Sequence, residues 1–191
     1  YYGTFTLRAD GASNFAAGKK WGFFPAAAFR WSVSNEPWLK DAHWLNDLSI
    51  RLSAGRSGND AVASYQSLAT LTAATSSWMF GNSTDLAYVP SKLENSNLTW
   101  ETTDSYNLGL NFAVLNSRIA LEADAYISNT RDLLLKMKTS QTTGFNTYFT
   151  NVGSTRNVGV EISLTTQNIR RRNFEWTSIL TASHNRQTVI D

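Results

Sequence analysis

Strict alternation of apolar and polar residues over positions 105–128 constrains the fold of this chain more than any other feature. From Tyr106 to Val114 the even-numbered residues are apolar, and the residues between them are small or polar. After the dipeptide Asn116–Ser117, the odd-numbered positions from 119 to 127 become the apolar ones. A period of two belongs to a strand, whose successive side chains point to opposite faces. The stretch therefore predicts a long β-hairpin with one apolar and one polar face.

Two environments explain such a hairpin. A soluble sandwich buries the apolar face in a protein core and leaves the polar face in water. A transmembrane barrel turns the apolar face to lipid and the polar face to its interior. Length favours the barrel, because a membrane-spanning strand needs roughly 9 to 11 residues and ordinary strands have about 5 or 6. Glu122 and Asp124, in mid-strand, also suit a hydrated interior better than a packed core.

The same alternation recurs along the chain and predicts about seven antiparallel strands. Besides the hairpin, we expect strands over residues 1–10, 21–34, 47–56 and 154–168, and from Phe174 onward. Pro25 predicts a bulge or irregular start in the second of these strands. Residues 57–96 are hardest to assign, with a further strand expected over Tyr65–Leu71. A short basic turn is expected over Arg170–Asn173.

The connections predict which end of the sheet faces which compartment. Those after Ser34, Leu115 and Ile169 are short to medium, and those after Asp10, Arg56 and Asp132 are longer. The two kinds alternate along the chain. This asymmetry is typical of bacterial outer-membrane barrels, which have short periplasmic turns and long extracellular loops.

Composition argues against several classes of function. The net charge of +2 is too small to indicate nucleic-acid binding, and the absence of cysteine excludes disulfides and thiolate metal sites. His43 and His184 have no partners at ligand spacing, so we expect neither a metal nor a cofactor. Phosphate-binding loops and serine elbows are also missing from the sequence. We therefore expect no catalytic residues and no enzyme activity.

One set of residues is a candidate for contact with a ligand or a partner, and a second set is expected to line the barrel interior. Aromatic side chains in the long connections can stack on sugars or anchor a protein, although packing of the loops against each other is the more common reason for such residues. These candidates are Trp78, Phe80, Tyr88, Phe145, Tyr148 and Phe149. Charged residues at polar positions of the strands are expected to face the barrel interior: Arg8, Asp10, Arg30, Arg51, Glu122 and Asp124. Five apolar residues are expected to face lipid: Leu108, Leu110, Phe112, Leu121 and Ala123.

Seven short motifs, in order along nearly the whole chain, point to one family. They are Leu7–Phe15, Trp21–Pro25, Trp31–Trp38, Leu98–Thr103, Arg131–Leu134, Asn151–Ser154 and Asn157–Glu161. Together they resemble the C-terminal half of the barrel in SusC/RagA-type TonB-dependent outer-membrane transporters. The resemblance implies a barrel of about 22 strands around an N-terminal plug. Seven strands are too few to close such a barrel, so we expect residues 1–191 to be one fragment of its wall, without the plug.

The resemblance also implies a function. The full-length protein would import a nutrient, an oligosaccharide or a peptide, across the outer membrane of a Gram-negative bacterium. It would work with a SusD-like lipoprotein and with TonB, in contact with outer-membrane lipid and without covalent chemistry. Two alternatives stay open on the residues alone: a passive porin-like barrel, and a soluble all-β module for binding or adhesion.

Overall fold

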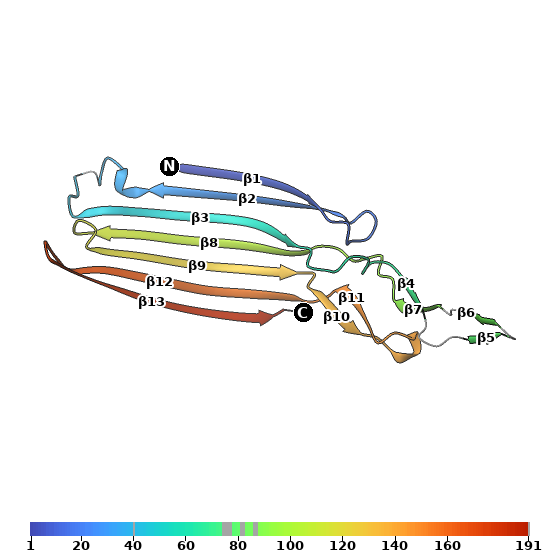
Figure 1. Ribbon diagram of the computed structural model, residues 1–191. Coiled ribbons are helices and arrows are strands. Elements are labelled where there is room, and N and C mark those ends of the chain that lie inside the picture. Colours follow the sequence, from blue (N-terminus) through green and yellow to red (C-terminus); the bar gives the residue numbers. More distant parts are fainter. Residues whose placement is uncertain (40, 74–77, 81–82, 86–87, 191) are drawn as a thin grey trace.

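A single antiparallel sheet of seven long strands dominates the structure (Figure 1). The computed structural model describes residues 1–39, 41–73, 78–80, 83–85 and 88–190. The strands of the sheet are β1 (Tyr2–Gly11), β2 (Trp21–Ser32), β3 (Leu45–Asn59), β8 (Glu101–Val114), β9 (Ile119–Arg131), β12 (Ser154–Arg171) and β13 (Phe174–Val189). Their order in the sheet is also their order in the sequence. The predicted all-β architecture with about seven antiparallel strands is confirmed.

The strand register places most apolar residues of the seven strands on the same side; Phe24 of β2 and Ile179 of β13 are among the exceptions. Leu52 lies opposite Leu108, Leu108 opposite Ala125, and Ala125 opposite Val160. We call this side the apolar face and the other side the polar face. All five residues predicted to share one side lie on the apolar face: Leu108, Leu110, Phe112, Leu121 and Ala123. A slip of one residue between any two strands would destroy this match, because side chains alternate with a period of two.

Two of the strands extend beyond the predicted bounds, whereas β2 ends at Ser32, two residues before the predicted end. The strand expected over 47–56 runs from Leu45 to Asn59. Arg170 and Arg171, expected in a turn, belong to β12, so the turn into β13 contains only residues 172–173. A sequence-based boundary stops where alternation weakens, whereas ladder hydrogen bonds between backbones continue beyond that point.

A bulge or an irregular start was predicted at Pro25, and the register shows no bulge there. Pro25 pairs with Leu7 in unbroken register along β1. On its other side, pairing with β3 begins one residue later, at Ala26. A proline has no N–H to donate, but no neighbouring strand on the β3 side requires one at this position.

Connections alternate between the two ends of the sheet, as predicted. One end carries the connections 33–44, 115–118 and 172–173, the first of which begins with the short helix η1 (Val33–Asn35). The other end carries the connections 12–20, 60–100 and 132–153 (Figure 1). The predicted contrast in length fails for the first pair, since 33–44 is longer than 12–20. We call the second end the long-loop end.

Small hairpins extend from the long-loop end (Figure 1). In connection 60–100, β4 (Thr70–Ala73) pairs with β7 (Tyr88–Lys92), and β5 (Trp78–Phe80) pairs with β6 (Ser83–Asp85). In connection 132–153, β10 (Leu134–Lys138) pairs with β11 (Thr147–Asn151), with the short helix η2 (Gln141–Thr143) between them. The strand expected over Tyr65–Leu71 is wrong, because residues 64–67 form a turn and β4 begins at Thr70.

A cluster of buried apolar side chains lies at the long-loop end, on the polar face. Phe24 reaches it from β2 and meets the Trp100 ring edge-on, with ring centroids 5.3 Å apart. Phe15, from connection 12–20, packs against the same Trp100 ring at 5.1 Å. The full loop cluster is Ala12, Phe15, Phe24, Val62, Leu98 and Trp100. It fastens two long connections to the wall, so the loops pack over the polar side of the sheet.

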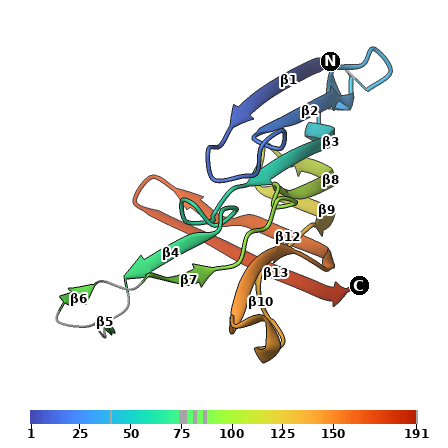
Figure 2. The same ribbon diagram turned by 90° about the vertical axis from the view of Figure 1, so that its right-hand side faces the viewer.

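The sheet is curved, as the view along the strands shows (Figure 2). Curvature and right-handed twist are what long antiparallel strands need in order to close into a barrel. Among the residues that the structure describes, no helix has the length and apolar character needed to cross a membrane.

Candidate functional site

The polar face brings together the charges that alternation predicted to share one side. All six lie on this face: Arg8, Asp10, Arg30, Arg51, Glu122 and Asp124. Neighbouring side chains compensate most of them. Arg8 lies 3.5 Å from Asp10, and Arg30 lies 3.7 Å from Asp47. These exposed pairs contribute little to stability and serve mainly to fix the orientation of the side chains.

One ion pair crosses an entire strand. Arg51 on β3 and Asp124 on β9 are not on adjacent strands, because β8 runs between them. Gly109 of β8 lies opposite both residues in the register. With no side chain there, Arg51 Nη2 reaches Asp124 Oδ2 at 2.9 Å. A glycine within a strand often marks such a close approach.

We expect Gly109→Ala to separate this pair. A Cβ at Gly109 would lie 2.6 Å from Asp124 Oδ1 and 2.8 Å from Arg51 Nε, so both side-chain ends would have to move away. A double-mutant cycle on positions 51 and 124 of the full-length protein should give a coupling of about 0.2–1 kcal/mol with glycine at 109. With alanine at 109 the coupling should approach zero.

Gly3→Ala is the matched control for that experiment, because a Cβ at Gly3 meets nothing within 4 Å. It should leave the coupling between positions 51 and 124 unchanged. A coupling that survives Gly109→Ala would show that the pair does not depend on the gap in β8.

Several buried polar atoms on the polar face have no partner among the described residues. They are Arg51 Nε, Asn111 Oδ1, Asn157 Oδ1 and Gln167 Oε1. All four belong to residues whose register places them on this face. Buried polar groups in folded proteins are normally satisfied by protein or by ordered water. The polar face is therefore built to meet a hydrated or polar neighbour.

Among the described residues, Glu122 has no ion-pair partner on the polar face. It lines a hollow of about 370 Å³ together with Asp124 and Glu161. Asp124 lies directly opposite Glu161 in the register, an arrangement of like charges that is destabilising unless a cation is near. Arg51 supplies one such cation to Asp124.

The aromatic candidates in the long loops divide into three groups. Phe149 packs against the loop cluster, and Phe145 and Tyr148 are half-buried, so packing accounts at least for Phe149. Tyr88 on β7 is 64% exposed. The side chains of Trp78 and Phe80 lie outside the described residues.

Sequence reasoning missed the loop cluster, which positions the long connections. Phe24 occupies a polar position of β2, where alternation predicts a wet side chain. A signal was present, because Phe23 and Phe24 are consecutive aromatics and so cannot share a face. Gly22 and Gly58 leave room for the Phe24 ring, since a Cβ at either would collide with it.

At the opposite end, Glu36 links the start of β1 to the end of β2. Its carboxylate accepts hydrogen bonds from the Tyr1 hydroxyl at 2.7 Å and from Trp31 Nε1 at 2.9 Å. The hydrogen bond from Tyr1, followed by that from Trp31, favours the ionised form and lowers the pKa of Glu36.

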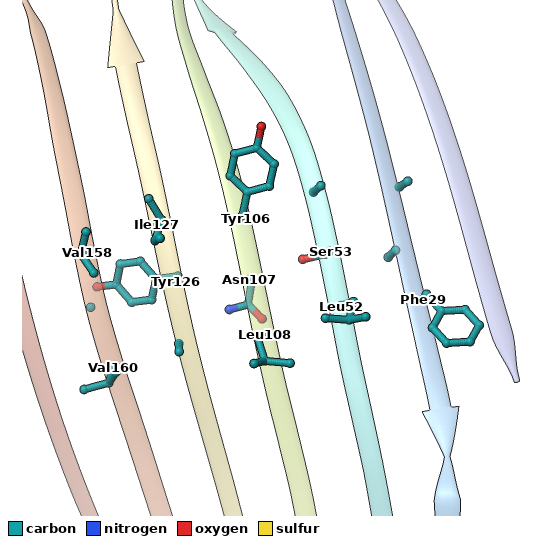
Figure 3. A pocket seen from close by; sticks show the side chains of 15 residues that line it. Phe29, Leu52, Ser53, Tyr106, Asn107, Leu108, Tyr126, Ile127, Val158 and Val160 are labelled. Carbon is teal, nitrogen blue, oxygen red and sulfur yellow. The ribbon is translucent and has the colours of Figure 1, made fainter.

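The apolar face carries a shallow hollow of about 680 Å³ (Figure 3). Phe29, Leu52, Leu108, Val158 and Val160 are among the residues that line it. Several alanines also line it. It is a dip in a broad apolar surface, with few polar groups to orient a ligand. In the part of the chain that is described, no group of three side chains could hold a metal ion.

Comparisons with known proteins agree with this geometry. The sequence model described as "TonB dependent receptor-like, beta-barrel" matches residues 1–189. TonB-dependent receptor P26 of Formosa agariphila is 37% identical over 191 residues, covering all of this chain and 19% of that protein. TonB-dependent receptor SusC of Bacteroides thetaiotaomicron is 37% identical over 196 residues, again covering all of this chain and 19% of that protein.

Solved structures give the same result. The RagAB peptide importer in its closed-closed state aligns with a TM-score of 0.89 and 26% identity, over 98% of this chain and 20% of the importer chain. The open-open state aligns with a TM-score of 0.86 over the same shares. The chain thus spans about a fifth of the length of these relatives. The chain belongs to the TonB-dependent receptor family and forms part of the β-barrel wall.

Proposed function

We propose that the full-length protein is an outer-membrane importer that takes up an oligosaccharide or peptide nutrient by TonB-dependent transport. Residues 1–191 supply wall and extracellular loops, and no covalent catalysis takes place. The proposal rests mainly on one observation: the seven strands are paired so that the sheet has one apolar face and one polar face. The family of the chain supports the same conclusion. Such a wall fits lipid on one side and a wet, plugged interior on the other.

The polar face supports the interior assignment. It carries paired charges, uncompensated Glu122 and buried polar atoms that need further partners. A plug or passing substrate would supply such partners, and lipid would not. The long-loop end, where Tyr88 is exposed and the loop cluster fixes two connections, then lies outside the cell. A SusD-like lipoprotein would cover this end, and TonB would act from the periplasm.

Cysteine labelling in intact membranes tests the orientation of the wall. Arg51→Cys on the polar face should react with a water-soluble thiol reagent and resist one confined to lipid. Leu108→Cys, on the apolar face of the adjacent strand, should show the opposite preference. The chain has no cysteine of its own, so there is no background within residues 1–191. Reversed labelling would mean that the two faces are assigned the wrong way round.

Energy dependence separates this proposal from a passive barrel. Uptake of the nutrient by cells that express the full-length receptor should stop when the proton-motive force is collapsed or TonB is deleted. Uptake that continues under both conditions would favour the porin-like alternative. Screening oligosaccharides and peptides in the same assay decides the substrate class. The structurally similar RagAB, a peptide importer, is a precedent for the peptide alternative.

A further inference from the structure

Three arginines gather on the apolar face near the long-loop end of the sheet. Arg131, Arg156 and Arg186 come from the neighbouring strands β9, β12 and β13. Arg156 lies opposite Asn129 on one side and Thr188 on the other. Arg131 is two residues from Asn129 on β9, and Arg186 is two residues from Thr188 on β13. Both are therefore diagonal neighbours of Arg156, and the Cα atom of each lies about 7–8 Å from that of Arg156. We call these three residues the arginine cluster.

Little on the protein neutralises this cluster. Asp104 is the only carboxylate of the described strands on this part of the apolar face, and Arg56 already holds it through two hydrogen bonds of 2.7 and 3.1 Å. Arg131 Nη1 lies 4.0 Å from Asp104 Oδ2, at the outer limit of an ion pair. All three side chains of the arginine cluster are exposed. Three cations so close together are mutually repulsive unless an anion joins them.

Within the described part of the chain, one neutral contact orients the cluster. Arg156 Nε donates to Asn129 Oδ1 at 2.8 Å, which fixes the plane of the guanidinium group. The two terminal nitrogens of Arg156 make no hydrogen bond with a side chain of the described residues. The same holds for the whole guanidinium group of Arg186. The central guanidinium is thus held in place with its donor edge free. Arginine donors in this fork arrangement match the oxygens of a phosphate group.

The arginine cluster lies next to the apolar side chains Ile127, Val158 and Val160 of the apolar face, which we call the apolar band. Arg186 lies opposite Val158, and Arg156 is two residues from Val158 on the same face. Asn129 is likewise two residues from Ile127 and on the same face. A ligand that satisfies both surfaces must carry its anionic group next to apolar chains. Lipids with phosphate headgroups have this construction, and basic clusters at membrane borders bind them.

We propose that the arginine cluster binds the phosphate headgroup of a lipid in the leaflet on the long-loop side. The inference rests on the proposed membrane orientation of the wall. The acyl chains of that lipid lie along Ile127, Val158 and Val160, and its phosphate bridges the guanidinium groups. An acidic protein segment would satisfy the charges but would leave the adjoining apolar band uncovered, so the geometry favours lipid.

Lipid retention by the full-length receptor tests the site. The receptor is placed in nanodiscs of phosphatidylcholine with a minor share of phosphatidic acid, and native mass spectrometry counts the phosphatidic acid that stays bound. The triple variant Arg131→Gln, Arg156→Gln and Arg186→Gln should lose affinity for phosphatidic acid by roughly tenfold or more, with retention of phosphatidylcholine unchanged. Arg186→Gln alone, which breaks no hydrogen bond of the described structure, should give a partial loss of the same kind.

Arg8→Gln is the matched control, because Arg8 also lies near the long-loop end but on the polar face. It should retain phosphatidic acid like the wild type. Equal retention by the triple variant, or an equal loss in Arg8→Gln, would overturn the proposal. A comparable difference between wild type and triple variant in binding inorganic phosphate alone would overturn the lipid assignment.

The cysteine labelling keeps this inference separate from the proposed function. If positions 51 and 108 label as expected and the triple variant still retains phosphatidic acid, only the lipid site is wrong. If the labelling is reversed, the apolar face does not contact lipid, and the lipid site fails together with the orientation of the wall.

Discussion

Leu110→Arg should destabilise the full-length receptor in a lipid bilayer by about 2–4 kcal/mol. Leu110 lies on the apolar face of β8, four residues before the strand ends at Val114, with Ile50 opposite on one neighbouring strand and Ala123 on the other. In the proposed orientation a guanidinium there faces hydrocarbon, which offers it neither water nor a carboxylate. Reversible unfolding by denaturant in liposomes measures the difference in unfolding free energy.

Asn111→Arg provides the comparison for that result. Residue 111 is the next position of the same strand, on the polar face and opposite Glu122. An arginine there meets a carboxylate and a polar interior, so the destabilisation should be a small fraction of that at residue 110. Equal losses at the two positions would contradict the assignment of one face to lipid and the other to the interior.

Phe24→Ala should release the long loops from the wall, at a local cost of about 3–5 kcal/mol. Phe24 is 3% exposed and fills the space that Gly22 and Gly58 leave open beside Trp100. Removing the ring leaves a cavity beneath connections 12–20 and 60–100, which it holds together with Phe15 and Val62. Hydrogen exchange of the full-length receptor should show faster exchange in both connections and unchanged protection in the centre of β8.

Phe23→Ala serves as the control, since Phe23 is the preceding residue, points to the apolar face and is 63% exposed. It removes an equal number of atoms and should leave loop protection unchanged. Uniform loss of protection across the sheet after Phe24→Ala would mean that the cluster supports the whole wall and not the loops alone.

The two faces of the sheet could be predicted from the sequence because each strand shows its own alternation of apolar and polar residues. Each strand carries its own period of two, so Leu108 and Leu121 reveal their shared face without knowledge of their neighbours. The Arg51–Asp124 pair could not be predicted, because it depends on the stagger of three strands and on the gap at Gly109. The period of a single strand carries no information on stagger.

The structure of residues 57–96 could not be predicted from the sequence. Nothing in 57–96 alternates over enough residues to separate a strand from a turn, so the strand expected over Tyr65–Leu71 was misplaced. Phe24 was missed for a related reason. Alternation assumes that the polar face is wet throughout, whereas at the long-loop end other parts of the chain fold over it and make it a core.

The unequal connections at the two ends have a consequence for which of them can change in length. Strands β3 and β8 pair along their whole length, so the ends of connection 60–100 are held together whatever lies between them. The entropy of closing a loop grows only with the logarithm of its length, and each doubling costs about 0.6 kcal/mol. By contrast, one residue added to 115–118 could shift β9 against β8 and exchange the two faces of every later strand. The connections at the long-loop end can therefore change in length at little cost, whereas the tight turns 115–118 and 172–173 are held to a fixed length by the pairing of the strands on either side.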